Sequence, residues 1–152
     1  MRMDAECACI AAGALCVAAL CDVAHDATQA DEARWRAATI LGDLGDNRAA
    51  PTLIALCADE SHDPRQGAIW ALGWLRHAGA FESLLRVVND MREDEQVRFV
   101  AACSLLSVDT ARAYPLLLEL SKNAPDGVRR AARAALANLA ERQRSREVFG
   151  HE

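Results

Sequence analysis

A chain of 152 residues, of which 52% are apolar, is long enough to form a hydrophobic core, and we expect one domain over residues 1–152. Its net charge of −5 argues against nucleic acid as a partner, because phosphate groups require a basic surface. Aromatic residues make up only 5% of the chain, so the core must consist mainly of alanine and leucine, which favours closely packed helices.

The N-terminal segment 4–25 is helical by composition and is expected to cover one end of the remaining structure. It forms either one long capping helix or a helix pair that is broken at Gly13. Its uncharged part, Ala8–Cys21, is too short to cross a bilayer, and Asp4 and Glu6 stand where a signal peptide carries positive charge. We therefore expect no membrane partner and a cytoplasmic location.

From residue 31 onward the sequence repeats itself. Four arginines recur at intervals of 31, 33 and 31 residues, each in the first helix of a repeat: Arg34, Arg65, Arg98 and Arg129. The third position after each arginine is alanine, the seventh is leucine, and the tenth is leucine or valine. These three positions share one helical stripe, which we expect to be buried. The repeats are expected at about 31–61, 62–93, 94–124 and 125–149.

Each first helix is followed by a turn and by a second helix with the same period. Equivalent places on the second helices are held by Leu53, Leu84, Leu117 and Val148, so the last second helix would be a stub that ends at Gly150. Pro51 and Pro115 are expected in the first turns of their helices, where proline is tolerated. An aspartate stands at the start of every first helix, as a cap or as a partner of the helix dipole: Asp31, Asp63, Asp94 and Asp126.

Two of the first helices carry a recognisable motif. Residues Ala37–Gly42 and Ala68–Gly73 are similar to an A-x-x-A-L-G signature, and they resemble the HEAT-like repeats named after phycobilisome lyases. Leu106 and Ala137 replace the glycine in the third and fourth repeats. A unit of two helices cannot bury both of its faces, so neighbouring units must stack. The expected fold is all-α, a short right-handed α-solenoid (α-α superhelix) of HEAT-like two-helix repeats.

This resemblance carries expectations about the surface as well as the fold. It implies that the second helices line a concave face that grips other macromolecules. We interpret the repeated arginines as a structural ladder to acidic residues of adjacent repeats rather than as a ligand site.

The residue patterns that would indicate catalysis or metal binding are missing from the sequence. Deoxyhypusine hydroxylases, which are similar in architecture, hold iron with His-Glu pairs one and two places after the repeated arginine. This chain has Trp35-Arg36, Gln66-Gly67, Phe99-Val100 and Arg130-Ala131 at those places. The six cysteines contain no C-x-x-C pair and are expected to be reduced and structural. We therefore predict no catalytic residue, no metal and no cofactor.

Two surfaces are candidates for binding a partner. The outward side of the second helices carries charges of both signs, which suit a peptide or protein but also an ordinary solvated surface: Arg48, Thr52, Glu82, Arg86, Asn89, Arg112, Glu119 and Lys122. The side of the first helices that faces away from the buried stripe carries aromatic residues: Trp35, Trp70, Trp74 and Phe99. Exposed aromatic clusters favour an interface. The alternatives are that segment 4–25 folds back over them, or that Trp74 packs between repeats.

A further group of arginines lies near the C-terminus and is interpreted as a solvated helix surface: Arg129, Arg130, Arg133, Arg142, Arg144 and Arg146.

The function that best fits these patterns is a protein-binding scaffold or adaptor without catalysis. Its partner would be another protein or peptide or, through the Trp35/Trp70 face, a second copy of the chain. The alternative is an accessory subunit of a lyase or another modifying enzyme. A deep pocket with converging histidine or acidic residues would favour the enzyme, whereas a groove beside an apolar patch would favour the scaffold.

Overall fold

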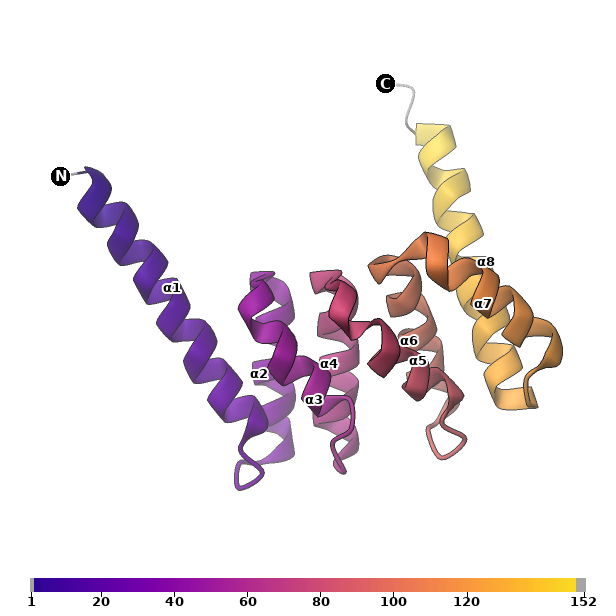
Figure 1. The fold of residues 1–152 in the computed structure, drawn as a ribbon, viewed down its shortest axis with the longest axis horizontal. Coiled ribbons are helices and arrows are strands. Elements are labelled where there is room, and N and C mark those ends of the chain that lie inside the picture. Colours follow the sequence, from indigo (N-terminus) through magenta and orange to yellow (C-terminus); the bar gives the residue numbers. More distant parts are fainter. Residues whose placement is uncertain (1, 150–152) are drawn as a thin grey trace. The chain divides into compact units, whose positions relative to one another are not determined.

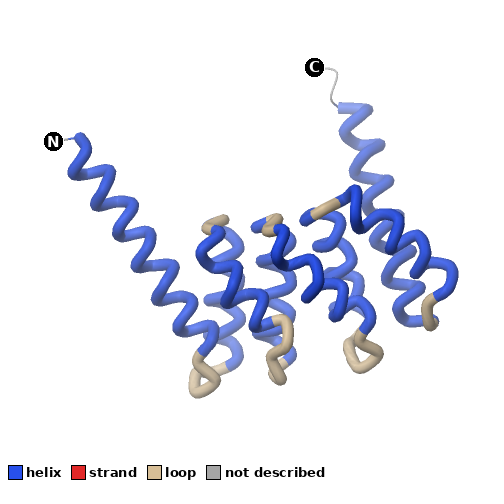
Figure 2. Tube along the Cα trace, in the orientation of Figure 1, coloured by secondary structure: helices blue, strands red, loops and turns tan. Residues whose placement is uncertain are grey.

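The computed structural model describes the backbone of residues 2–149 and the side chains of residues 13–146. Within these residues it contains helices and loops and no strand (Figures 1 and 2). The helices are α1 (Arg2–His25), α2 (Asp31–Leu44), η1 (Asn47–Ala49), α3 (Ala50–Leu56), α4 (His62–Leu75), η2 (Ala78–Ala80), α5 (Phe81–Asn89), α6 (Glu95–Val108), α7 (Thr110–Asn123) and α8 (Asp126–Phe149). The predicted all-α fold of two-helix repeats is confirmed.

Contacts within the chain gather its helices into two compact units. The first unit ends at Leu75 and holds α1 to α4, and the second begins at Arg76 and holds η2 and α5 to α8. In each unit the first helices of successive repeats pack against one another, α2 on α4 and α6 on α8. The assignment of residues 1–152 to a single domain stays a prediction.

The buried stripe of the first helices differs from the predicted one at its edges. The alanines at position 3 are all buried, and so are the leucines at position 7 in the first three repeats. Position 10 is not buried, since Leu44 is 51% exposed. In the first three repeats positions 4 and 8 are buried in its place, for example Ala38 and Gly42 in α2. The stripe is shifted because a first helix packs against another first helix as well as against its own second helix.

Small residues allow α2 and α4 to approach each other closely. A Cβ atom added at Gly42 would lie 2.7 Å from the Cα of Ala71, and one added at Gly67 would lie 2.9 Å from Cδ1 of Trp35. Each helix therefore places a glycine against the other, and neither glycine leaves room for a methyl group. The glycine that ends the sequence motif is thus required by backbone proximity.

The repeated arginines make structural contacts, and their ladder to acids of adjacent repeats stays a prediction. Arg34 is 3% exposed; its Nε donates to the carbonyl of Ala24 over 3.1 Å, and its two terminal nitrogens donate to the carboxylate of Asp59 in the same repeat. Arg65 and Arg98 donate to main-chain carbonyls of the loop before their own helix. Because loop carbonyls have no helical partners, an arginine fork satisfies several of them at once.

The second helices bury the predicted leucines completely, since Leu53, Leu84 and Leu117 are each 0% exposed. The chain enters α3 and α5 through the 3-10 turns η1 and η2, each capped by the side chain of the preceding residue, Asp46 or His77. Proline at the start of α3 is confirmed.

The prediction for Pro115 is wrong, because this proline lies inside α7. Asp109 caps α7 through the N–H of Arg112 and directly follows the last residue of α6. Without an intervening turn the helix begins earlier than it does in the other repeats, so Pro115 falls beyond the first turn.

The aspartates at the starts of the first helices act mainly through charge. Asp94 is a true N-cap, since its Oδ1 accepts from the N–H of Val97 over 2.8 Å. Asp31, Asp63 and Asp126 lie inside the first turns of their helices, where a negative charge complements the helix dipole.

The two ends of the chain are long helices. Residues 4–25 form part of the continuous helix α1, which is not broken at Gly13. The predicted stub of a last second helix is wrong, because α8 continues from Asp126 to Phe149 without a turn. The side chains of Val148 and Phe149 lie outside the described residues, as does Gly150. The segment after Ala137 contains no glycine before Gly150 and no proline, so nothing in it ends the helix. No helix within residues 2–149 has both the length and the apolar character needed to cross a membrane.

Replacing Gly42 with alanine should destabilise the chain by about 1–3 kcal/mol, because the new methyl group overlaps the α4 backbone at Ala71. Gly13→Ala is the matched control: a Cβ at Gly13 meets nothing within 4 Å, and alanine favours a helix by up to about 1 kcal/mol. Thermal unfolding followed by circular dichroism measures both changes. Equal effects of the two substitutions would contradict the close approach.

Replacing Asp59 with asparagine should lower the free energy of unfolding by about 2–3 kcal/mol at pH 7, because Arg34 is buried and loses its charged partner. Burial raises the pKa of Asp59. Hydrogen bonds from Arg34 and from the Ser61 N–H, together with the charges of Arg34 and Arg65, lower this pKa by more, so the net shift is downward. The pKa of Asp59 is thus lower in the folded chain than in the unfolded chain, where it is about 3.9. Ionised Asp59 therefore stabilises the fold at pH values above about 3.9, and this stabilisation is lost as the pH falls through the folded-state pKa.

Urea unfolding between pH 7 and pH 3 therefore provides the test. The difference between the original chain and Asp59→Asn should be constant near neutrality and shrink below about pH 4. Asp43→Asn removes an exposed carboxylate of α2 and should change stability by less than about 0.5 kcal/mol. A difference that grows on acidification would exclude the ion pair as its cause.

Candidate interaction surfaces

The tryptophans of the first unit form one aromatic surface on α2 and α4. Trp70 and Trp74 are 47% and 54% exposed, and their ring centroids lie 5.7 Å apart at an interplanar angle of 49°. Trp35, at 38% exposure, lies with its ring edge against Gly67. Residues 67, 70 and 74 follow one face of α4, so the three indoles form a continuous patch, which we call the tryptophan surface.

The alternatives in which other parts of the chain cover these rings are not found within the described residues. The C-terminal part of α1 packs against α2 and α3, burying Val17 and Ala24, and the indoles remain exposed beside it. Phe99 lies on α6 in the second unit and is half-buried. It is therefore described apart from the tryptophan surface.

The charged surface predicted on the second helices is divided between the two units. Arg48 and Thr52 lie in the first, and the other six residues lie on α5 and α7 of the second: Glu82, Arg86, Asn89, Arg112, Glu119 and Lys122. All eight are exposed except Thr52, which is half-buried. Their use by a partner stays a prediction.

Several of these side chains are already engaged within the chain. Arg112 forms an ion pair with Glu82, and its guanidinium lies 3.9 Å from the centroid of the Phe81 ring, so it connects α7 to α5. Arg48 is paired with Asp46 in the preceding turn and holds the pKa of that carboxyl at about 2. Asn89 donates to the carbonyl of Leu85. These contacts leave fewer polar groups for a partner than the sequence indicates.

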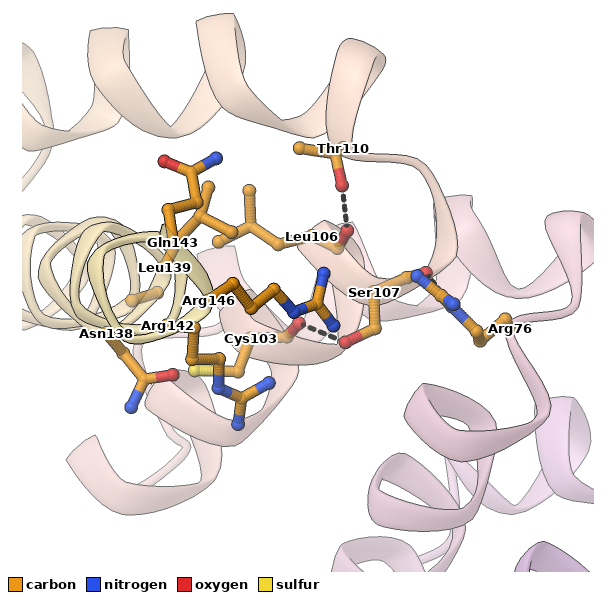
Figure 3. A pocket seen from close by; sticks show the side chains of 11 residues that line it. Arg76, Cys103, Leu106, Ser107, Thr110, Asn138, Leu139, Arg142, Gln143 and Arg146 are labelled. Atoms are coloured by element: carbon orange, nitrogen blue, oxygen red, sulfur yellow. Dashed lines mark hydrogen bonds between the residues drawn. The ribbon is translucent and has the colours of Figure 1, made fainter. Parts of the chain in front are cut away.

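A cavity that the sequence analysis did not predict lies in the second unit, beside α6, the start of α7, and α8 (Figure 3). Its volume is about 180 Å³. Polar side chains around it include Arg76, Ser107, Thr110, Arg142 and Arg146. Two of these arginines belong to the C-terminal group that was interpreted as a solvated surface. Their spacing of four residues on one helix was the available signal, since it places both on one face.

The cavity is also lined by a thiol, that of Cys103. Burial raises the pKa of the Cys103 thiol, and the charge of Arg142 lowers it by less. A raised pKa keeps the sulfur protonated at neutral pH, whereas catalytic cysteines act as thiolates. Among the side chains of residues 13–146, no group of three His, Cys, Asp or Glu residues could hold a metal ion.

The remaining cysteines with described side chains are Cys16, Cys21 and Cys57, and they, like Cys103, are free thiols. Cys7 and Cys9, which were included in the prediction of reduced cysteines, lie outside the described side chains.

Comparison with protein families decides what kind of repeat this is. Residues 17–95 and again 58–137 match the family model of HEAT repeats. The chain belongs to the HEAT repeat family. The predicted resemblance is thereby confirmed. No curated protein matches the chain.

Two solved structures are similar to this HEAT-repeat chain. Human deoxyhypusine hydroxylase in complex with glycerol matches with a TM-score of 0.70 and 25% identity, over 85% of this chain and 45% of that one. The complex of CpcE and CpcF of phycocyanin lyase from Nostoc sp. PCC7120 matches with a TM-score of 0.60 and 24% identity, over 82% and 53%. The chain spans about half the length of these structures. That it is not an enzyme stays a prediction.

Alkylation should distinguish the cysteines of the HEAT-repeat chain by their surroundings. Cys16 is exposed and should react first with iodoacetamide, whereas Cys103 should react slowly at pH 7 and faster only above about pH 8.5, because its pKa is raised. Peptide mass spectrometry after timed labelling measures both rates in one sample. Rapid labelling of Cys103 at pH 7 would show a thiolate and restore a nucleophilic role.

Proposed function

We propose that this HEAT-repeat chain is a protein-binding module whose main contact is the tryptophan surface. The observation that carries the proposal is the exposure of Trp70 and Trp74 as a ring pair on one helix. Tryptophan is enriched among the residues that dominate binding energy, and adjacent exposed indoles are unfavourable in water. A partner that covers both rings would gain their burial without unfolding any part of α4.

The helix packing supports the same proposal. The backbones of α2 and α4 approach closely at Gly42, and the edge of the Trp35 ring lies directly against Gly67. The rings therefore lie on a rigid base of two packed helices. A rigid aromatic anchor loses little conformational entropy when a partner binds.

The partner that fits this surface is a protein segment with apolar side chains. Flat, paired indoles offer a contact area to aliphatic or aromatic groups, and the net charge of −5 does not suit nucleic acid. A second copy of this chain is the other protein that can cover the rings.

The double substitution Trp70→Ser/Trp74→Ser should remove partner binding and leave the fold intact. Both rings are about half exposed, so their loss should cost little stability, whereas a binding hot spot of this kind contributes about 2–4 kcal/mol. Affinity capture from the native host, with the original chain and the variant as paired baits, measures binding. Sedimentation velocity of the isolated chain shows whether the partner is a second copy.

The control variant is Tyr114→Ser, which removes an exposed aromatic ring, 47% accessible, from α7 in the second unit. It should retain every partner that the double tryptophan variant loses. Partners retained equally by both variants would place the interface elsewhere. A collapse of the thermal transition in Trp70→Ser/Trp74→Ser would show that the rings support the core.

A further inference from the structure

The cavity in the second unit is lined by arginine side chains, and no acidic side chain among the described residues lines it to balance their charge. Of its eleven lining residues, Arg76, Arg142 and Arg146 are arginines, and none is aspartate or glutamate. Figure 3 shows Arg142 and Arg146, from α8, beside Cys103 and Ser107 of α6. Three guanidinium groups around about 180 Å³ produce a strongly positive site in a chain whose net charge is negative.

The two arginines from α8 are distinguished from their neighbours by lacking partners. Within the described side chains, Arg142 and Arg146 form no ion pair and no hydrogen bond. The other arginines of this helix are all engaged: Arg129 with Asp126, Arg130 with Glu95, Arg133 with the carbonyl of Ser121, and Arg144 with the carbonyl of Ala140. Like charges four residues apart repel each other on a helix, so a bound anion would stabilise Arg142 and Arg146 in their places.

Arg76 is held beside the cavity by a hydrogen bond to α6, and its backbone conformation is unusual. Its φ of 52° is the only positive value among the described residues other than glycine, and its Nε donates to the carbonyl of Ser107 over 2.8 Å. A left-handed conformation is costly for an arginine, and such residues gather at binding sites. The hydrogen bond uses Nε only, so both terminal nitrogens of Arg76 remain available to a ligand.

Apolar side chains complete the cavity and limit what can enter it. Leu106 and Leu139 lie on its wall together with Ala135. The volume corresponds to about six water molecules, which is enough for an anionic group with a few attached carbon atoms. Guanidinium groups bind phosphate and carboxylate oxygens through paired hydrogen bonds, and these charge-assisted bonds are strong.

We propose that this cavity binds an oxyanion group, phosphate or carboxylate, on a small organic molecule with an apolar body. Arg142 and Arg146 are the principal anion ligands, and Arg76 binds from beside Ser107 at the C-terminal end of α6. The site lies in the second unit, goes beyond the proposed protein-binding function and does not depend on it.

Isothermal titration calorimetry at low ionic strength, with phenyl phosphate and with benzoate as separate probes, tests the proposal. Binding should weaken at least tenfold in Arg142→Gln/Arg146→Gln, because two charge-assisted contacts are lost. Arg144→Gln is the matched control: it removes an exposed arginine of the same helix that does not line the cavity. It should bind both probes within about twofold of the original chain.

The two probes separate the kinds of oxyanion. Binding of phenyl phosphate alone identifies a phosphate site, binding of benzoate alone a carboxylate site, and binding of both a site for either group. Each of these results supports the proposal. It is overturned if neither probe binds, or if Arg144→Gln weakens binding as much as the double variant.

A second measurement uses the original sequence and needs no cavity variant. Cys103 lines the cavity, so bound phenyl phosphate should slow its alkylation at least severalfold and leave the rate at exposed Cys16 unchanged. Equal slowing at both cysteines would contradict binding at this site. Trp70→Ser/Trp74→Ser should bind phenyl phosphate normally, so failure of the protein-binding function and failure of this site are distinguishable.

Discussion

The close approach of α2 and α4 is the constraint on which the first unit depends. With Gly42 against the backbone of Ala71, and Gly67 against Trp35, the two helices pack through residues with little or no side chain. A core of this kind gains stability from many short contacts between backbones. Gly67 leaves room for the edge of the Trp35 ring at this contact, whereas the rings of Trp70 and Trp74 on α4 remain about half exposed.

Much of the fold could be predicted because its signals are local and periodic. The alanine and leucine at positions 3 and 7 face the core of each repeat, and one period fixes them on every first helix. The predicted burial of position 10 is wrong, because its exposure depends on which neighbouring helix a first helix packs against. The length of α8 was missed for a related reason: matching Val148 to Leu53 by period alone ignores the lack of any turn residue between the two expected helices.

The candidate sites show a similar division. The exposure of Trp70 and Trp74 could be predicted from their positions on the helix. The contacts of Arg112 with Phe81 and Glu82 could not, because they depend on side-chain positions that residue spacing does not determine. The arginine-lined cavity joins Arg76 to Arg146, residues far apart in sequence, and only the folded second unit brings them together. Its sequence signal, two arginines one turn apart, also occurs on ordinary solvated helices.

The location of all three tryptophans on α2 and α4 gives the molecule an intrinsic optical label for one of its units. Fluorescence emission reports the surroundings of residues before Leu75, while far-ultraviolet dichroism reports helices throughout the chain. Coincidence of the two signals during denaturation would mean that both units unfold as one cooperative body. Separation of the two transitions would assign a distinct stability to each half of the chain.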